Sequence, residues 1–425
     1  MNARQLHHRM SPHQVSVILE SYLHKELSSS QAREKLGLGK TQFFALKKEY
    51  EAQGKEAFTL SRKRNVSNNR ISKDAEDALR KELEREQSLI DNKDMPITHH
   101  NYSAINDILR GEYDIHISLP TVINRAKEWG FYQERRKKQH PHDREVITNF
   151  PGELIQHDAS IHLFSPYMEN KLSLITSIDD YSRRMLFADL FERETVWAHI
   201  SALKKTILTF GCPLKYYADQ HSIFRFVRGR DKNSAWYRLG RQTGEVRTQF
   251  EQVLSECNVG LSWALSPQAK GKVERPYRWL QDRLVRAAAR KKITDKETLR
   301  QELFSLVEQY NTKWVHSTTG EIPAVRFEQA LNDGRCLFTP LSLAQTGKEV
   351  DDVFALRVQR FVDAYRKVSL DGNSLCVPQG IPRAKVDLRL VPNENSGLCA
   401  VRFWQDGVYV GKQNVKNEDI AMVRF

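Results

Sequence analysis

Hydrophobic residues recur every three or four positions through the first part of the chain, which is the spacing of helices with one buried face. In the stretch "SPHQVSVILESYLHKEL", Ser11 and Pro12 are typical of the start of a helix. A short helix is expected to end at Leu36-Gly37, and after a tight turn a further helix is expected from about 40 to 50. Two helices joined in this way form a helix-turn-helix unit.

The second helix of such a unit carries the candidates for contact with DNA, because this helix enters the major groove. Phe43 and Leu46 are expected to face the core. The exposed candidates for DNA contact are Lys40, Thr41, Gln42, Lys47 and Lys48. A plain helical bundle with a solvated basic face is the alternative.

A second helix-turn-helix unit is predicted after a basic linker and a charged helix at about 73–92. Its second helix begins at Ser118, and its expected core residues are Val122, Ile123, Ala126 and Trp129. Its candidates for DNA contact are Thr121, Asn124, Arg125 and Lys127. The linker bases Arg62, Lys63 and Arg64 have no acid beside them and are expected to lie along a phosphate backbone. Two such units would recognise a bipartite site, unless one of them serves dimerisation.

Strand-like runs replace the helical pattern after a second basic linker. The runs "ELIQHDASIHLF", "LSLITSIDDYS" and "RMLFADLFE" predict three antiparallel strands. A helix at about 195–210, a strand "LKYYAD", a helix at about 244–257, a strand "GLSWAL" and a further helix follow. The pattern indicates an α/β domain with a mixed sheet. Near the end of the chain, "RKVSLDGNSLCVP" and "AVRFWQDGVYVGK" each place Asp-Gly between strand-like runs, which predicts two hairpins in a small antiparallel barrel.

The expected architecture is therefore multidomain, with N-terminal all-α helix-turn-helix units, a central α/β mixed sheet and a C-terminal small β-barrel. The expected bounds are 1–60 and 74–132 for the two helix-turn-helix domains, 61–73 and 133–150 for the basic linkers, 151–330 for the core with a basic insertion at 221–244, and 350–425 for the barrel. A chain that starts after residue 132 is expected to lose specific recognition of DNA but to keep a folded core.

The charge of the chain narrows the class of partner. The 425 residues carry a formal charge of +13, which favours a polyanion. No apolar run approaches the length of a membrane-spanning helix, and the first residues lack the apolar segment of a signal peptide. Double-stranded DNA is therefore the expected partner, with no membrane, and the cytoplasm is the expected location. The five cysteines form no C-x-x-C pair, which argues against a structural zinc site.

Three acids fit a site for metal-dependent chemistry on phosphodiesters, which needs carboxylates from different elements to converge on one point. Asp158 lies in the first strand, Asp219 at the end of the fourth, and Glu274 one turn into the helix after "SPQAKGK". A lone acid near a strand end is more often a turn or cap residue, but the three in this order form a stronger pattern. The bases expected to hold DNA against Glu274 are Lys270, Lys272 and Arg275.

The stretches "ELIQHDAS", "SIDDYSRR", "YYADQHSIF" and "SPQAKGKVERPYRWLQ" resemble motifs of the integrase-type DDE transposases of bacterial insertion sequences, most closely the ISNCY type. The resemblance covers roughly 150–330 and implies an RNase H-like fold. It implies that Asp158, Asp219 and Glu274 bind two Mg²⁺ or Mn²⁺ ions. It also implies binding to terminal inverted repeats, cleavage at the ends of the element, joining of the 3′-OH to target DNA, a homodimer or larger assembly on DNA, and a location at the bacterial nucleoid.

Two features depart from the pattern of this family. The chain between Asp219 and Glu274 is longer than usual by a segment, 221–244, in which bases and aromatic residues are interleaved. This segment, with Arg225, Arg228 and Arg230, is expected to lie against DNA, and a solvated loop is the alternative. Gln281 stands on the same helix face as Glu274, where many relatives have Lys or Arg. Contact with DNA or with the metal site, and a simple helix-surface role, are both open for Gln281.

Asp179 and Asp180 are the rival carboxylates, and we interpret them as turn residues of the hairpin between the second and third strands. His157 and His221 adjoin the proposed acids and are candidates for supporting roles. Two other functions stay open. One is a non-catalytic, sequence-specific DNA-binding regulator with an inherited core, although all three acids are present. The other is an RNase H-like nuclease without strand transfer.

Overall fold

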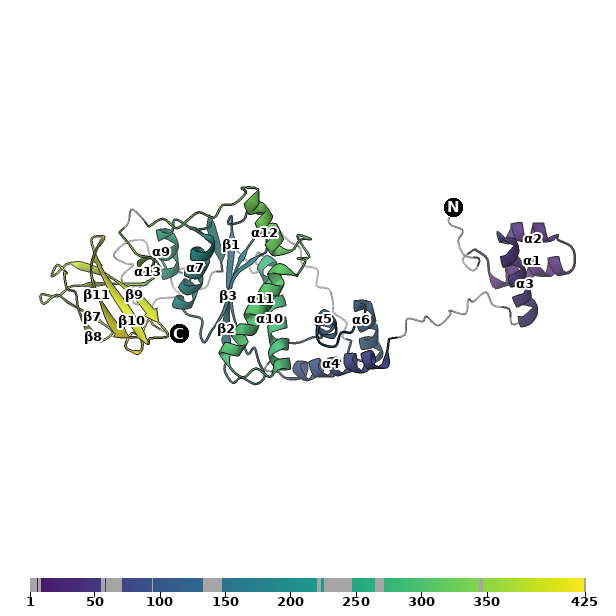
Figure 1. Ribbon diagram of the computed structural model, residues 1–425, viewed down its shortest axis with the longest axis horizontal. Coiled ribbons are helices and arrows are strands. Elements are labelled where there is room, and N and C mark those ends of the chain that lie inside the picture. The colour runs from purple at the N-terminus through teal and green to yellow at the C-terminus, as the bar shows by residue number, and fades with distance from the viewer. Residues whose placement is uncertain are drawn as a thin grey trace. The chain divides into compact units, whose positions relative to one another are not determined.

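The computed structural model describes most of the chain, as two compact units (Figure 1). The described residues are 6, 9–54, 58, 71–93, 95–132, 147–219, 223–224, 247–263, 271–343 and 347–423, without the side chains of residues 53 and 271–275. The first unit is Met1–Lys73 and the second is Asp74–Phe425.

Three short helices form the first unit: α1 (Pro12–Leu23), α2 (Ser29–Leu36) and α3 (Lys40–Gln53). The Ser11 side chain accepts a hydrogen bond from the Gln14 backbone in a capping box, which confirms the predicted start of α1. Gly37 has a φ of 61°, in the left-handed region that favours glycine, and ends α2 as predicted. Side chains from all three helices share one buried core: Val15, Leu19, Ala32, Leu36 and Phe43.

The next three helices begin the second unit: α4 (Lys73–Asp91), α5 (Tyr102–Glu112) and α6 (Leu119–Glu128). The Ser118 side chain caps α6 by accepting a hydrogen bond from the Thr121 backbone, as the sequence predicted. A small core joins these helices: Leu79, Leu83, Ile105, Leu109, Val122 and Ala126. The chain at the end of α4 leaves this small core, because Leu89, Met95 and Ile97 are buried among residues of the neighbouring sheet and its helices.

A five-stranded mixed sheet forms the centre of the second unit. Its strands are β1 (Ile155–His162), β2 (Leu172–Asp179), β3 (Met185–Phe191), β4 (Lys215–Ala218) and β5 (Gly260–Trp263). They lie in the order β3-β2-β1-β4-β5, with antiparallel pairs among the first three strands and parallel pairs from β1 to β5. The predicted mixed sheet is confirmed.

Helices cover both faces of the sheet (Figure 1). These helices are α7 (Val196–Phe210), α9 (Gln249–Glu256), α10 (Gly271–Lys291), α11 (Lys296–Thr312) and, after α11, α12 (Pro323–Asn332). Leu174 and Leu190 pack with α10 and α11 on one face. Ile155 and Tyr216 pack with α7 and α9 on the other. Because successive strand residues point to opposite faces, every residue of β1 can be assigned to one of these two layers.

The predicted C-terminal barrel is wrong, because the strands form an open sheet. The elements are α13 (Val350–Val353), β6 (Leu356–Phe361), β7 (Lys367–Leu370), β8 (Asn373–Cys376), β9 (Lys385–Asn393), β10 (Leu398–Gln405), β11 (Val408–Lys416) and the 3-10 turn Asn417–Asp419. Strands β11-β10-β9-β6 make a four-stranded antiparallel sheet, and β7-β8 make a separate ribbon. A closed barrel would need a continuous ladder of backbone hydrogen bonds between β11 and the β7-β8 ribbon. In the described backbone, one hydrogen bond joins β11 to the chain after β8, from Gln379 N to Val410 O (3.3 Å).

Both predicted Asp-Gly hairpins are present within this open sheet. Asp371 and Gly372 have φ values of 47° and 87°, and Asp406 and Gly407 have values of 49° and 78°. Two consecutive positive φ values are the requirement of the type I′ turn, which is why Asp-Gly occurs there. The local turn signals were therefore correct even though the closure of the barrel was not.

Candidate active site

Asp158 and Asp219 occupy matching positions on two neighbouring parallel strands. β1 pairs with β4 through Ile155–Tyr216 and Gln156–Tyr217, so paired residues are 61 positions apart. The same offset separates Asp158 from Asp219, which directly follows β4. Since neighbouring strands lie about 4.8 Å apart, the two carboxylates arise from adjacent points of the backbone.

The alternation of side chains along β1 assigns Asp158 to the layer of α10. His157 lies in the opposite layer, where its ring packs against Tyr216 and Phe250. Ser160, two positions after Asp158, shares the face of Asp158. The site therefore lies between the sheet and α10.

Helix α10 is attached to this face by two side-chain hydrogen bonds. The Tyr277 hydroxyl donates to the Leu174 carbonyl of β2, and the Gln281 amide donates to the Ser160 hydroxyl of β1. Burial raises the pKa of Tyr277 well above its ordinary value, and the negative charge of Asp158 raises that pKa further. The sequence did not single out Tyr277 or Ser160. Their spacing could have indicated them, because Tyr277 lies three positions after Glu274 and Ser160 lies two positions after Asp158.

The backbone of Glu274 belongs to the same stripe of α10. Glu274 precedes Tyr277 by three positions and Gln281 by seven, and residues at these intervals share one face of a helix. The Cα of Glu274 therefore lies one turn before Tyr277, on the side of the helix that meets the sheet. The side chain of Glu274 lies outside the described part of the structure.

The donors at this position fit a hard divalent cation. Carboxylate oxygens are the ligands that Mg²⁺ and Mn²⁺ prefer, and Asp158 and Asp219 supply them from neighbouring strands. Among the described side chains, no group of three His, Cys, Asp or Glu residues forms a complete set of metal ligands. Of the three expected acids, Asp158 and Asp219 are the two whose side chains the structure describes.

Two buried histidines form a chain of hydrogen bonds behind the site. The Ser177 hydroxyl lies 2.9 Å from His157 Nδ1, His157 Nε2 lies 2.8 Å from His199 Nδ1, and His199 Nε2 lies 3.2 Å from Glu194 Oε1. A carboxylate accepts hydrogen bonds, so His199 Nε2–H donates to Glu194. Every nitrogen of the two rings is bonded. The supporting role of His157 in the site stays a prediction, and His221 lies outside the described residues.

The rival acids Asp179 and Asp180 serve the turn after β2. Asp179 accepts hydrogen bonds from the Ser182 backbone and hydroxyl at 2.9 and 2.6 Å, and from the Gly152 backbone at 2.9 Å. Burial raises the pKa of Asp179 to about 6. Asp180 makes an ion pair with Arg183 at 2.7 Å. The interpretation of both acids as turn residues is confirmed.

The expected DNA contacts of α3 lie on its solvent side. Lys40, Thr41, Gln42 and Lys48 are exposed, while Lys47 is partly buried and pairs with Glu51 at 3.1 Å. The sequence analysis did not include Phe44, which is also exposed and lies on the same helix.

Within α6, Asn124 and Lys127 are exposed, and Thr121 lies 2.8 Å from the Ser118 hydroxyl. The Arg125 guanidinium pairs with Glu76 at 2.7 Å and with Glu128 at 2.6 Å, so it takes part in holding α6 to α4. The remaining predicted contacts lie outside the described side chains: Arg62, Lys63, Arg64, Arg225, Arg228, Arg230, Lys270, Lys272 and Arg275.

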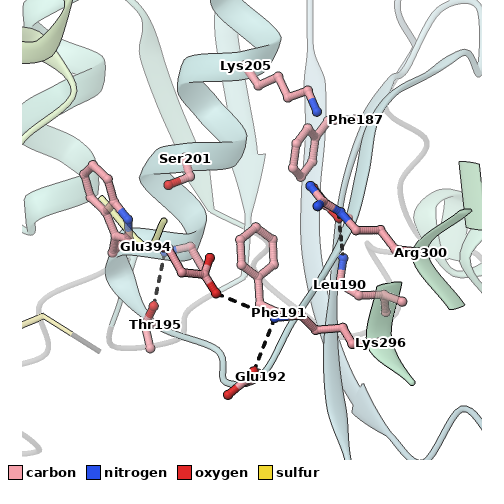
Figure 2. Close-up of a pocket in the computed structure, with 13 residues that line it drawn as sticks. Phe187, Leu190, Phe191, Glu192, Thr195, Ser201, Lys205, Lys296, Arg300 and Glu394 are labelled. Carbon is pink, nitrogen blue, oxygen red and sulfur yellow. Dashed lines mark hydrogen bonds and ion pairs between the residues drawn. The ribbon is translucent and has the colours of Figure 1, made fainter. Parts of the chain in front are cut away.

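A cavity of about 270 Å³ lies between β3, α7 and α11, and Figure 2 shows its lining. Lys296 pairs with Glu192 at 3.3 Å and with Glu394 at 3.7 Å, and Arg300 pairs with Asp189 at 2.6 Å. The lining does not include the two site aspartates. Because the acids of the lining offset its bases, the cavity has no surplus of positive charge for a phosphate.

No helix among the described residues has the length and apolar composition needed to cross a membrane.

No family model matches the chain. It is 27% identical over 282 residues to "Putative transposase y4bF" of Sinorhizobium fredii, a match that covers 65% of this chain and 56% of that protein. It is 31% identical over 212 residues to "Transposase for insertion sequence IS1202" of Streptococcus pneumoniae, covering 50% of this chain and 41% of that protein. The chain thus spans about half the length of the curated relatives that it matches. These relatives carry no indication of the ISNCY type, which stays a prediction.

Solved structures similar to the chain include integrases. The catalytic core domain of HTLV-2 integrase in complex with magnesium is 17% identical, with a TM-score of 0.30, and the match covers 42% of this chain and 97% of that one. The simian T-cell lymphotropic virus intasome in complex with the PP2A regulatory subunit B56 gamma is 15% identical, with a TM-score of 0.35, and the match covers 75% of this chain and 93% of that one.

Proposed function

We propose that this chain, which is related in sequence to two bacterial transposases, is a DDE transposase. It would bind the terminal inverted repeats of an insertion sequence, cleave DNA at the ends and join the 3′-OH to target DNA. The observation that carries the proposal is the placement of Asp158 and Asp219 on paired parallel strands, facing the helix that contains Glu274.

Asp158, Asp219 and Glu274 would hold two Mg²⁺ or Mn²⁺ ions. When bound, such ions activate the attacking oxygen and stabilise the leaving oxygen of a phosphodiester. The chain itself supplies the fixed geometry. Asp158 lies on β1 and Asp219 directly follows β4, which is paired with β1, and Tyr277 and Gln281 attach α10 to the sheet.

The partner would be double-stranded DNA, both as ends and as target. The net charge of +13 and the exposed bases Lys40 and Lys48 of α3 support this partner. Joining two ends to one target requires two active sites, so at least a homodimer is expected on DNA.

The test is a set of isosteric substitutions: Asp158→Asn, Asp219→Asn and Glu274→Gln. Each is expected to lower Mg²⁺-dependent cleavage by roughly 100-fold or more, comparable with the loss of one preorganised electrostatic contact to a transition state. Binding to end DNA should stay close to wild type, because the proposed role of these acids is metal binding. Cleavage of labelled end duplexes and gel-shift binding measure the two properties.

Asp180→Asn is the matched control, since this neighbouring acid serves the turn, and its cleavage rate should follow its folded fraction. If one of the three variants cleaves at the wild-type rate, the acid changed in that variant does not belong to the site. Joining of a pre-cut 3′-OH end to a plasmid distinguishes a transposase from a nuclease. A wild-type chain that binds ends without cleaving them would be the non-catalytic regulator.

A further inference from the structure

Helix α10 has a second row of contacts, beyond those that hold it to the sheet. Arg283, Arg286 and Arg290 are spaced by three and four positions and so share one face of α10. Apart from Asp282 of α10 itself, which lies 3.1 Å from Arg286, their ion-pair partners belong to α4 and α5. These pairs are Arg283–Asp107 (2.7 Å), Arg286–Glu86 (3.3 Å), Arg290–Glu112 and Arg290–Glu82.

The middle of this contact is shielded from water. The side chains of Glu82 and Glu86 are 3% and 7% exposed, and those of Arg286 and Arg290 are 4% and 12% exposed. Removal of one partner from a buried ion pair leaves a charge without compensation. The helices α4 and α5 are therefore strongly held to α10 in this one arrangement.

Apolar packing and an amide contact reinforce the same attachment. Leu89, Met95 and Ile97 are buried in the cluster that contains Leu280 and Leu284 of α10. The Asn101 side chain, at the cap of α5, donates a hydrogen bond to Asp282. The attachment thus extends from the end of α4 to the start of α5.

The exposed face of α6 is fixed to the same body. Val122 and Ala126 are buried against Ile105 and Leu109 of α5, which leaves Asn124 and Lys127 on the solvent side. Along α10, the contacts with this helical unit begin at Asp282 and end at Arg290. At about 1.5 Å per residue, this interval lies roughly 12 to 24 Å along the helix axis from Glu274.

We propose that α10 fixes the distance along DNA between the bases that α6 contacts and the phosphodiester that reacts. The inference rests on the proposed function, and it assigns the choice of spacing to Arg283, Arg286 and Arg290 and their acidic partners. The segment 133–146 connects the two parts in sequence but does not set the spacing.

The test maps where α6 meets DNA. An Asn124→Cys variant carries a photoreactive group on the new thiol. Cys336, which is partly exposed, and Cys376, which is exposed, are changed to Ser so that they do not react. The probes are duplexes from the two ends of the element that contains the gene of this chain. We expect crosslinks at one base of each end. Insertion of about eight Gly-Ser residues into 133–146 lengthens this connection by roughly 15 Å, and the crosslinked base should stay the same.

Reversal of two acids that face α10, Asp107→Arg with Glu112→Arg, should spread the crosslinks over neighbouring bases and lower the yield at the main base several-fold. Both side chains are 50% exposed, so the helices themselves should keep their fold, which circular dichroism checks. Asp77→Arg with Asp114→Arg is the matched control, because it changes the charge equally at exposed sites. It should leave the crosslinked base unchanged.

Three results would overturn this proposal. They are a crosslinked base that moves with the Gly-Ser insertion, crosslinks confined to one base in the Asp107→Arg, Glu112→Arg variant, and the absence of crosslinking by α6. The proposed function fails separately, if the wild-type chain does not cleave the same duplexes with Mg²⁺. The crosslinking result would stand in that case, because it requires binding and no chemistry.

Discussion

The two groups of N-terminal helices, α1–α3 and α4–α6, follow a similar local pattern but differ in what holds them. The first has its own buried core within the compact unit Met1–Lys73. The second shares Leu89, Met95 and Ile97 with the central domain, and its acids pair with the arginines of α10. The second group of helices therefore has a defined geometry relative to the central sheet, whereas the first is compact by its own contacts.

Truncation should produce the largest difference between the two units. Removal of residues 1–70 should leave the melting temperature of the remaining chain unchanged, because the first unit is compact by itself. Removal of residues 1–132 should destabilise the core, because Leu280 and Leu284 of α10 would lose their apolar packing against the end of α4 and the chain after it. At roughly 1.5–3 kcal/mol for each side chain uncovered, the loss is a large part of the stability of a typical domain, about 5–15 kcal/mol.

Soluble yield and thermal unfolding of both truncated chains measure this difference. The expectation for the second truncation reverses the one drawn from the sequence, which was a folded core. A core that starts after residue 132 and melts like the full chain would make the second unit as independent as the first.

Single ion pairs should show the same contrast on a smaller scale. Arg290→Met leaves Glu82, 3% exposed, without its partner from α10 and should lower the free energy of unfolding of the second unit by about 3 kcal/mol. Lys47→Met removes a partly exposed ion pair within α3 and should change stability by less than about 0.5 kcal/mol. Urea unfolding followed by circular dichroism gives both values. Equal effects would contradict the difference in shielding between the two units.

The smallest expected difference between the two units is in the pH dependence of their stability, and the pKa of Glu86 gives its sign. Burial raises the pKa of Glu86 to about 7, from 4.5. The folded state then binds a proton that the unfolded state has lost, so the favourable contribution is complete below pH 4.5 and disappears as the pH rises through 7. Glu86→Gln, which cannot titrate, should flatten the decrease in stability of the second unit over this range.

The isolated first unit is the control for this measurement and should show no change from the same buffers, since it does not contain Glu86. An unchanged pH slope in the Glu86→Gln variant would assign the decrease to another buried group, of which Asp179 has the next relevant pKa, about 6.

Local signals in the sequence predicted the elements well. Ser11, Gly37 and the two Asp-Gly turns act within a few residues of themselves, and the structure places helix ends and hairpins where they indicate. The mixed character of the central sheet also followed, because three antiparallel strands precede an alternation of helix and strand.

Contacts between distant residues could not be predicted in the same way. Glu82 and Glu86 lie in a highly charged helix, which suggests a solvated surface, and their burial depends on arginines about 200 positions later. The barrel failed for a related reason, since turn residues specify which strands form a hairpin but not whether the outer edges meet. At the candidate site, Asp158 and Asp219 could be named from their strands, whereas Tyr277 and Ser160 gain meaning only once α10 lies on β1.

The hydrogen-bonded histidines behind β1 bear on which metals the site would accept. Imidazole nitrogens bind Zn²⁺ and Cu²⁺ well, and cells contain metals that bind such sites more tightly than Mg²⁺ does. His157 is adjacent to Asp158, yet both nitrogens of its ring are bonded to Ser177 and His199, and His199 is in turn bonded to Glu194. Both rings also lie in the layer of α7 and α9, on the face of the sheet opposite Asp158. If the proposed site holds a cation, the two described aspartates would offer it oxygen ligands, which Mg²⁺ prefers, and these two histidines would not compete as nitrogen ligands.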